Sequence, residues 1–296
     1  MKKLIIAACC LLGAVTFANA QEVQEERSPL LTKNGYRYLP VAGDISLGID
    51  ATPFFQYLGN SFNGSFNNSA PLFNGVDNKI YAKYFLDANT AIRAKLRFNF
   101  YGDKHKQTVA DDYQRATNPL NVNATTVDVL RERKQDIELS LGYEMRRGHG
   151  RVQGFYGGEF NIGYLGGNDL YEYGNEMTTL NQNPTTTTNF FTNPATVANA
   201  ANRTLERAYG KSLTLGLGGF VGVEYFFAPQ ISVGGELGLG FRYAIKGQDE
   251  ITAHQFNTAT NAVEEYSYRE RRAIDEAFFS GIQTNVTGSI FLMFHF

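Results

Sequence analysis

S-G-I-Q-T-N-V-T-G-S-I-F-L-M-F-H-F, the segment from Ser280 to Phe296, has an alternating pattern that indicates the fold of the chain. Taken in steps of two, one set of its side chains is mainly apolar: Ile282, Thr284, Val286, Gly288, Ile290, Leu292, Phe294 and Phe296. The other set is mixed and mostly small or polar: Gln283, Asn285, Thr287, Ser289, Phe291, Met293 and His295. Because successive side chains of a strand point to opposite faces, the segment predicts one long β-strand with an apolar face and a mixed face.

The same alternation recurs in seven earlier segments, near residues 41–51, 79–86, 92–100, 136–146, 151–164, 212–225 and 231–246. Short turns at Asp87–Thr90, Arg147–Gly150 and Ala228–Gln230 alternate with long polar stretches at 59–77, 102–134, 165–208 and 247–277. Such sorting of connections by length is typical of outer-membrane barrels. The sequence therefore predicts an all-β fold: an eight-stranded antiparallel up-and-down transmembrane β-barrel over residues 41–296. Its turns would be periplasmic, its long loops extracellular and both termini periplasmic. A further hairpin within 165–208 would make ten strands, and this alternative stays open.

Composition agrees with a β protein. The chain has 296 residues, 30 of them Gly, and 14% are aromatic. No apolar run after residue 20 reaches the about 20 residues that a transmembrane helix needs. The formal net charge of −2 is too mild to indicate a nucleic-acid partner.

The first twenty residues have the pattern of a secretory signal peptide. Lys2 and Lys3 precede an apolar stretch, and Ala18-Asn19-Ala20 supplies a small-residue cleavage site. We expect residues 1–20 to be removed and residues 21–40 to form a periplasmic lead-in. Both cysteines lie within the signal, and lipoprotein processing at Cys9 stays open as an alternative.

Aromatic residues on the predicted apolar faces fall into two groups. At the periplasmic ends lie Tyr84, Tyr143, Tyr225, Phe294 and Phe296, and at the outer ends lie Phe98, Phe100, Tyr164, Phe241 and Tyr243. The positions between them are mostly aliphatic or Gly, although Tyr156 and Phe160 depart from this pattern. Two aromatic belts around an aliphatic band are typical of a bilayer-spanning barrel. We therefore expect outer-membrane lipid and lipopolysaccharide to surround the barrel.

Three segments resemble the small OmpA/OmpX-type outer-membrane β-barrels. They are Y-F-L-D-A-N-T-A-I-R-A from Tyr84, E-Y-F-F-A-P-Q-I-S-V-G-G-E-L-G-L-G-F from Glu224, and the terminal F-L-M-F-H-F. The resemblance implies a bacterial outer-membrane location and recognition of the terminal Phe by the barrel-insertion machinery. It does not decide the function, since that superfamily includes structural proteins, adhesins, small pores and a few enzymes.

Charged residues occupy the predicted inward face. They are Lys83, Arg93, Lys95, Arg97, Asp136, Glu138, Glu144, Glu159, Glu224, Glu236 and Arg242. An eight-stranded barrel is just wide enough for side chains to fill, and an unpaired buried charge is costly. The sequence thus predicts a salt-bridge network that plugs the lumen, with a narrow porin-like channel for ions or small solutes as the alternative.

Catalysis has little support. His105 shares a polar stretch with Asp111, which leaves an enzyme at the outer rim as a second alternative, but we find no nucleophile motif and no metal-ligand spacing. We expect a non-enzymatic protein without cofactor or metal. The long stretches rich in Tyr, Asn and Thr suit contact with an extracellular ligand or adhesion.

Overall fold

The computed structural model describes residues 30–52, 54–55, 78–118, 120–270, 276–280 and 287–296. In this part the protein is almost entirely antiparallel β-structure, which confirms the predicted all-β class. The one named helix is the short α3 (Asp112–Thr117). No helix among these residues has the length and apolarity needed to cross a membrane. The expected signal peptide and the predicted loop at 59–77 lie outside the described residues.

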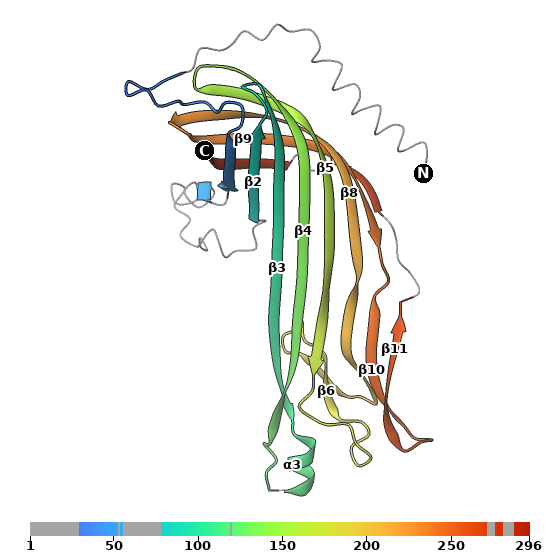
Figure 1. Ribbon diagram of the computed structural model, residues 1–296. Coiled ribbons are helices and arrows are strands. Elements are labelled where there is room, and N and C mark those ends of the chain that lie inside the picture. The colour runs from blue at the N-terminus through green and yellow to red at the C-terminus, as the bar shows by residue number, and fades with distance from the viewer. Residues whose placement is uncertain (1–29, 53, 56–77, 119, 271–275, 281–286) are drawn as a thin grey trace, which may run out of the picture.

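The main sheet closes on itself as a ring (Figure 1). Around the ring the strands follow the order β8, β5, β4, β3, β2, β1, β13 and β9, and pairing of β8 with β9 closes the circle. Their bounds are β1 (Ile45–Asp50), β2 (Asn78–Phe85), β3 (Thr90–Ala110), β4 (Thr125–His149), β5 (Val152–Glu172), β8 (Asn202–Ala228), β9 (Ile231–Lys246) and β13 (Thr287–His295). The closing segment of the sequence, β13, joins β1 to β9 as the alternation predicts.

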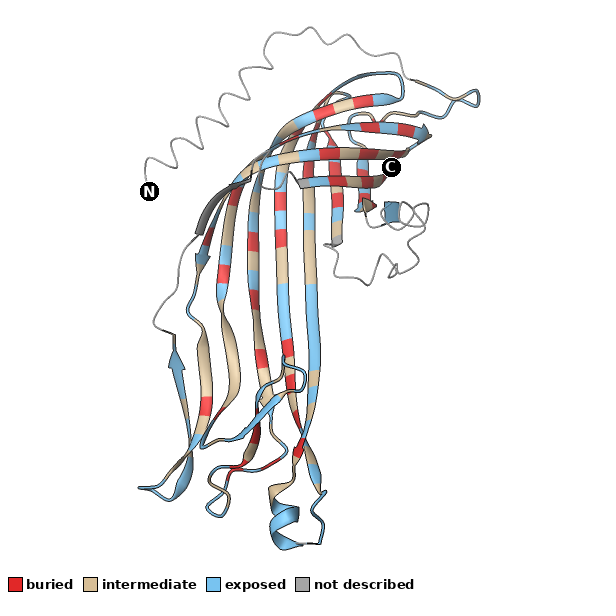
Figure 2. Cartoon of the chain, turned by 180° about the vertical axis from the view of Figure 1, so that it is seen from behind, coloured by how far each residue is buried: buried red, intermediate tan, exposed pale blue. Residues whose placement is uncertain are grey.

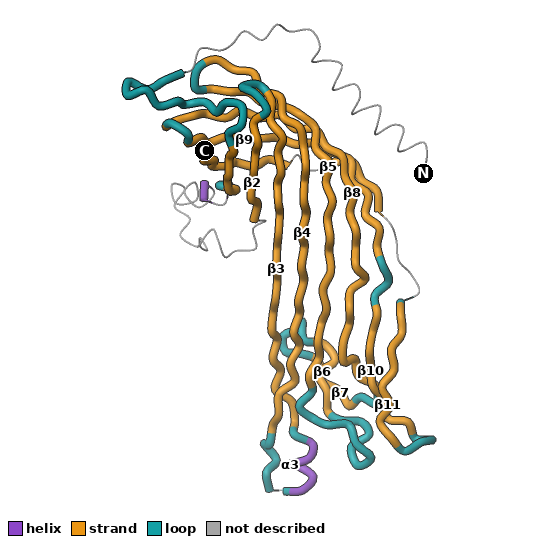
Figure 3. The backbone as a smooth tube through the Cα atoms, in the orientation of Figure 1, coloured by secondary structure: helices purple, strands orange, loops and turns teal. Residues whose placement is uncertain are grey.

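Four of these strands continue far beyond the ring, as Figure 1 shows for β3, β4, β5 and β8. We call the continuation the distal wall: residues 99–110, 125–135, 166–172 and 202–209 of these strands, together with β10 (Glu250–Asn257) and β11 (Ala262–Arg269). The strand β12 (Glu276–Ser280) pairs with β9. Figure 3 places α3, the hairpin of β6 (Thr185–Asn189) and β7 (Thr196–Asn199), and most long connections at the far end of this wall.

The predicted short turns are confirmed. The β2–β3 turn is fixed by Asp87, whose carboxylate accepts hydrogen bonds from the backbone N–H of Asn89 and the hydroxyl of Thr90, both at 2.6 Å. The β8–β9 turn consists of Pro229 and Gln230, and the β4–β5 turn of Gly150 and Arg151.

The predicted long loops are wrong in extent. Most of 102–134 belongs to β3 and β4, which pair without interruption to Ala110 and Thr125. Strands also occupy much of 247–277, and 165–208 contains the ends of β5 and β8. The hairpin within 165–208 does form, but as a separate two-stranded sheet outside the ring. The sequence does not show these strand extensions because both faces of the distal wall are mostly polar. Apolar and polar side chains therefore do not alternate there, although the backbones pair.

The outward face of the ring is apolar although it is exposed. Side chains that share this property include Ile45, Leu47, Ile49, Ile80, Ile92, Leu96, Leu139, Leu141, Phe160, Ile162, Leu217, Val221, Leu237 and Leu239. Among the aromatic residues predicted for the two belts, seven are exposed on this face: Tyr84, Phe100, Tyr225, Phe241, Tyr243, Phe294 and Phe296. Phe98, Tyr143 and Tyr164 are half-buried. Figure 2 shows buried residues alternating with exposed ones along the ring strands.

The apolar band ends at one level of the sheet. Phe98, Ile137, Tyr164, Leu213 and Ile245 are register partners in sequence across β3, β4, β5, β8 and β9. Beyond this row the outward positions of β3 are mostly polar, beginning with Gly102, Lys104 and Lys106 after the last aromatic side chain, Phe100. The ring and the distal wall therefore differ sharply in the chemistry of their outer face.

Candidate functional site

The interior of the ring holds ion pairs that reach from one side to the other. Lys83 on β2 has its Nζ 3.4 Å from Glu224 Oε2 on β8, and Arg93 Nη2 on β3 lies 2.8 Å from Glu236 Oε2 on β9. In each case three strands separate the partners in either direction around the ring. The partners thus lie on opposite walls, so a single pair of side chains spans the interior.

Glu144 and Arg146 complete the layer nearest the short turns. Lys83 Nζ lies 3.0 Å from Glu144 Oε1, and Arg146 binds both acids, at 3.2 Å to Glu144 and 2.7 Å to Glu224. These four side chains are at most 2% exposed. Sequence reasoning left Arg146 out of the site, although it shares the inward parity of Glu144.

His295 closes this layer from β13. Its Nδ1 lies 2.5 Å from the hydroxyl of Ser46, and its Nε2 lies 2.9 Å from the hydroxyl of Ser232 and 3.3 Å from Glu224 Oε1. The ring of Phe226 packs 5.0 Å from the imidazole. Sequence analysis placed His295 on the mixed face of its strand but did not assign it to the charge network.

The remaining predicted charges pair in layers farther from the turns. Lys95 Nζ lies 2.9 Å from Glu159 Oε1, Arg97 binds Asp136 at 2.7 Å, and Arg242 lies 2.8 Å from Glu138. The structure therefore brings every residue predicted for the network into an ion pair. One pair does not join neighbouring strands. Lys95 on β3 pairs with Glu159 on β5 rather than with an acid on the adjacent strand β4.

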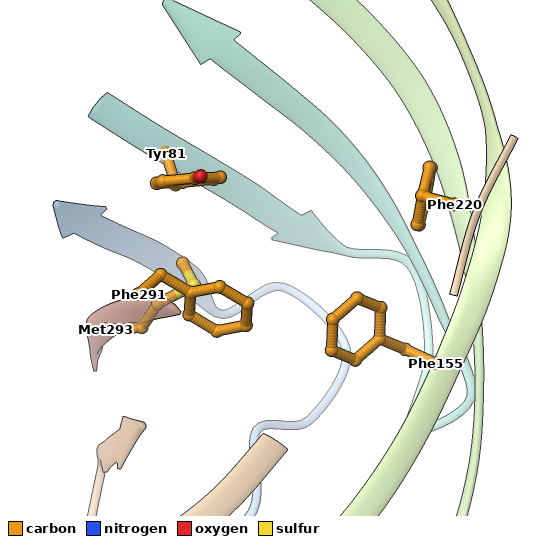
Figure 4. Close-up of a cluster of buried hydrophobic side chains, with 5 residues drawn as sticks. All are labelled: Tyr81, Phe155, Phe220, Phe291 and Met293. Carbon is orange, nitrogen blue, oxygen red and sulfur yellow. The ribbon is translucent and has the colours of Figure 1, made fainter. Parts of the chain in front are cut away.

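Between these layers lies an aromatic cluster that the sequence did not reveal. Figure 4 shows Tyr81, Phe155, Phe220, Phe291 and Met293 gathered in the ring. Phe155 on β5 and Phe291 on β13 meet across the interior at 5.9 Å. The cluster covers the cations: Lys83 Nζ lies 4.7 Å from the ring of Phe155, and the guanidinium of Arg93 lies 3.9 Å from that of Phe220.

Glycines on β8 and β9 make room for these rings. A Cβ built on Gly222 would overlap the ring of Phe155, and one on Gly234 would overlap the ring of Phe291. Each of these two rings therefore lies over the glycine that is its register partner on the neighbouring strand. The arrangement fills the interior with paired charge and aromatic carbon.

At the far end of the distal wall, connecting segments fold back onto the sheet. Asp128 is fully buried and its carboxylate accepts hydrogen bonds from the backbone N–H groups of Gly174 and Thr187, at 2.9 and 2.8 Å. Asp112 accepts from the backbone N–H and hydroxyl of Thr185, both at 2.7 Å, and from Asn181. Burial alone would raise the pKa of Asp112, but these hydrogen bonds outweigh it and hold the pKa below its ordinary value.

The two residues suggested for a rim enzyme do not come together. Asp111 is the N-cap of α3 and accepts a hydrogen bond from the backbone N–H of Gln114. His105 lies on β3 with its Nε2 3.1 Å from Glu132 Oε2. His254, the other histidine of the wall, accepts a hydrogen bond from Arg203 at 2.9 Å. Burial of the imidazole lowers the pKa of His254, and the positive charge of Arg203 lowers it further. His105 and Asp111 therefore have separate hydrogen-bond partners.

No protein-family model matches the sequence, and no curated protein is significantly similar to it.

Proposed function

We propose that the protein is an integral outer-membrane protein, in which the ring is an eight-stranded barrel without a solute path and the distal wall is a surface for contact with an extracellular ligand. The OmpA/OmpX-type resemblance of the turn and terminal segments supports the same assignment. Outer-membrane lipid and lipopolysaccharide are then the surroundings of the ring.

The observation that carries the proposal is that the ring has an exposed apolar outer face and, at the same time, an interior filled by ion pairs. A soluble protein rarely exposes so large a contiguous apolar surface, whereas lipid favours it. The band on β3 runs from Ile92 to Phe100, which matches the about 9–11 residues of a membrane-spanning strand. The polar outer face that follows suits water.

The distal wall supports a role at the cell surface. Strands β4 and β8 have 25 and 27 residues, far more than a membrane requires. The eleven residues of β4 beyond the band, 125–135, give the wall a height of roughly 35 Å. A rigid sheet of this height, bearing folded segments at its tip, would hold a binding surface well clear of the lipid headgroups.

The same interior argues against the channel alternative. Ions would have to displace charges that bridge opposite walls at two levels, and isolated buried charges cost several kcal/mol each. The separate partners of His105 and Asp111 give no support to the enzyme alternative.

Gel mobility and circular dichroism test the proposal together. The protein purified in detergent should give a β spectrum and run faster on a gel before boiling than after it. A protein that stays soluble and folded without detergent would contradict the membrane assignment.

A further inference from the structure

Three carboxylates lie in one row on the inner face of the distal wall, the face continuous with the ring interior. Asp103 on β3 is the register partner of Glu132 on β4, and Glu132 is the register partner of Asp169 on β5. Like charges directly opposite one another destabilise a sheet. Such a row therefore calls for a compensating positive charge.

A histidine completes the group. One donor atom each from Asp103, His105 and Glu132 lie within 4.8 Å of one another. The residues come from two paired strands, which fix their relative positions, and Glu132 is only 7% exposed. Two carboxylate oxygens and one imidazole nitrogen are a donor set suited to divalent cations of borderline softness such as Zn²⁺.

Asp169 supplies an independent indication. Its side chain is 4% exposed, and its Oδ2 accepts a hydrogen bond from the hydroxyl of Tyr209 at 2.6 Å. Its Oδ1 is buried and has no hydrogen-bond partner among the described residues. A buried acceptor without a partner is costly and indicates an ordered water or an ion beside it. Because Asp169 is the register partner of Glu132, the two carboxylates lie on neighbouring strands in the same row.

The cations nearby only partly neutralise the group. Lys134 Nζ lies 3.5 Å from Glu132 Oε1, but the side chain is 47% exposed and can turn toward water. Arg207 is the register partner of Asp169, yet its guanidinium binds Asp249 and Glu270, at 3.0 and 3.1 Å. Among the described residues, Lys134 and His105 are thus the basic groups that contact the row, and Asp103 also accepts a hydrogen bond from the hydroxyl of Tyr101.

Aromatic side chains of one connecting segment lie beside the group. The ring of Phe191 lies 5.3 Å from the imidazole of His105, and the ring of Phe190 lies 6.2 Å from Tyr171 on β5. Both phenylalanines belong to the β6–β7 hairpin segment, which folds over this face. Of the three donors only Glu132 is buried, and its reduced contact with water strengthens the attraction between its carboxylate and a cation.

We propose that Asp103, His105 and Glu132 bind a divalent cation of the Zn²⁺ type on the inner face of the distal wall. The free oxygen of Asp169 accepts a hydrogen bond from a water on the ion. The ion links β3 to β4 and holds the β6–β7 segment over them through His105 and Phe191. This site goes beyond the proposed membrane role and holds whether or not the ring lies in a bilayer.

Calorimetric titration of the whole chain, folded in detergent and stripped with EDTA, tests the site with ZnCl₂ as the probe. We expect one Zn²⁺ per chain for the unchanged protein and an affinity at least about tenfold lower for His105→Ala and for Glu132→Gln. His149→Ala is the matched control, because His149 is an exposed histidine at the other end of the same strand pair, and it should bind as the unchanged protein does. Titration of the unchanged protein with Co²⁺ should give visible bands of nitrogen and oxygen ligands, a readout that needs no variant.

Several outcomes would overturn the site. They are absence of Zn²⁺ and Co²⁺ binding to the unchanged protein, undiminished affinity in His105→Ala, or an equal loss in His149→Ala. Tight Ca²⁺ binding that His105→Ala leaves unchanged would indicate an oxygen-only site and would also contradict the assignment. Gel mobility before boiling shows separately whether each variant is folded.

Discussion

Removing Glu224 should destabilise the ring more than any exposed charge can. Its carboxylate lies 2.7 Å from Arg146, 3.4 Å from Lys83 and 3.3 Å from His295. In Glu224→Ala, Lys83, Arg93 and Arg146 keep Glu144 as their one shared acid in this layer. Breaking a buried pair so that charge is left unpaired costs about 3–5 kcal/mol. A typical native protein is stable by only about 5–15 kcal/mol.

Urea unfolding in detergent micelles measures this cost. With an m-value of about 2 kcal/mol per molar urea, the midpoint should fall by roughly 2 M. The chain has no Trp, so circular dichroism and gel mobility without boiling should follow the transition. Glu250→Ala is the control, because Glu250 pairs with Arg269 through side chains 46% and 70% exposed, and such pairs contribute at most about 1 kcal/mol. Equal midpoints for the two variants would refute the reasoning.

Three further perturbations test other parts of the molecule. In planar bilayers the unchanged protein should be silent, while joint alanine replacement of Arg93, Lys95 and Arg97 should leave buried acids that hydrate and carry cation current; open channels in the unchanged protein would contradict a plugged interior. Replacing exposed Phe296 with Asp should lower the amount assembled in the outer membrane more than Phe191→Asp in the β6–β7 segment, and equal surface levels would exclude a role for the terminal aromatic residue. Because the folded pKa of Asp112 is lowered, its contribution is complete above the unfolded value of about 4 and is lost as the pH falls through the folded value. Limited proteolysis should therefore cut near Thr185 in strong acid, and Asp112→Asn should make the same segment cleavable at pH 7; unchanged cleavage would exclude the clamp.

The ring strands could be predicted because one of their faces is apolar and the other is not. That contrast appears in the sequence as a period of two, and short turns such as Asp87–Thr90 mark where each strand ends. The distal wall has polar residues on both faces, so its strands carry no period. Residues 102–110 and 125–134 pair along their backbones without an alternation of apolar and polar side chains, and they were predicted as loop for this reason.

The charges of the candidate site follow from strand parity, but their partners do not. Lys83 meets Glu224 because ring closure places β2 opposite β8, a relation that no local pattern contains. Phe155 and Phe291 were missed because isolated aromatic residues on a mixed face resemble any other strand residue. His105 and Glu132 stand 27 positions apart, on the parts of β3 and β4 that were predicted as loop, so the sequence did not predict that they are close.

Spin-label accessibility in lipid vesicles tests most directly whether the ring spans a membrane. Both cysteines lie at positions 9 and 10, within the expected signal peptide, so a single cysteine can carry the label at Leu139 on the apolar band or at Lys104 on the outer face of the distal wall. If the ring spans a membrane, a label at residue 139 is relaxed by oxygen dissolved in lipid and shielded from a water-soluble nickel chelate, with the opposite result at residue 104. A label at residue 139 that the nickel chelate reaches as readily as one at residue 104 would show that the apolar band does not lie in lipid.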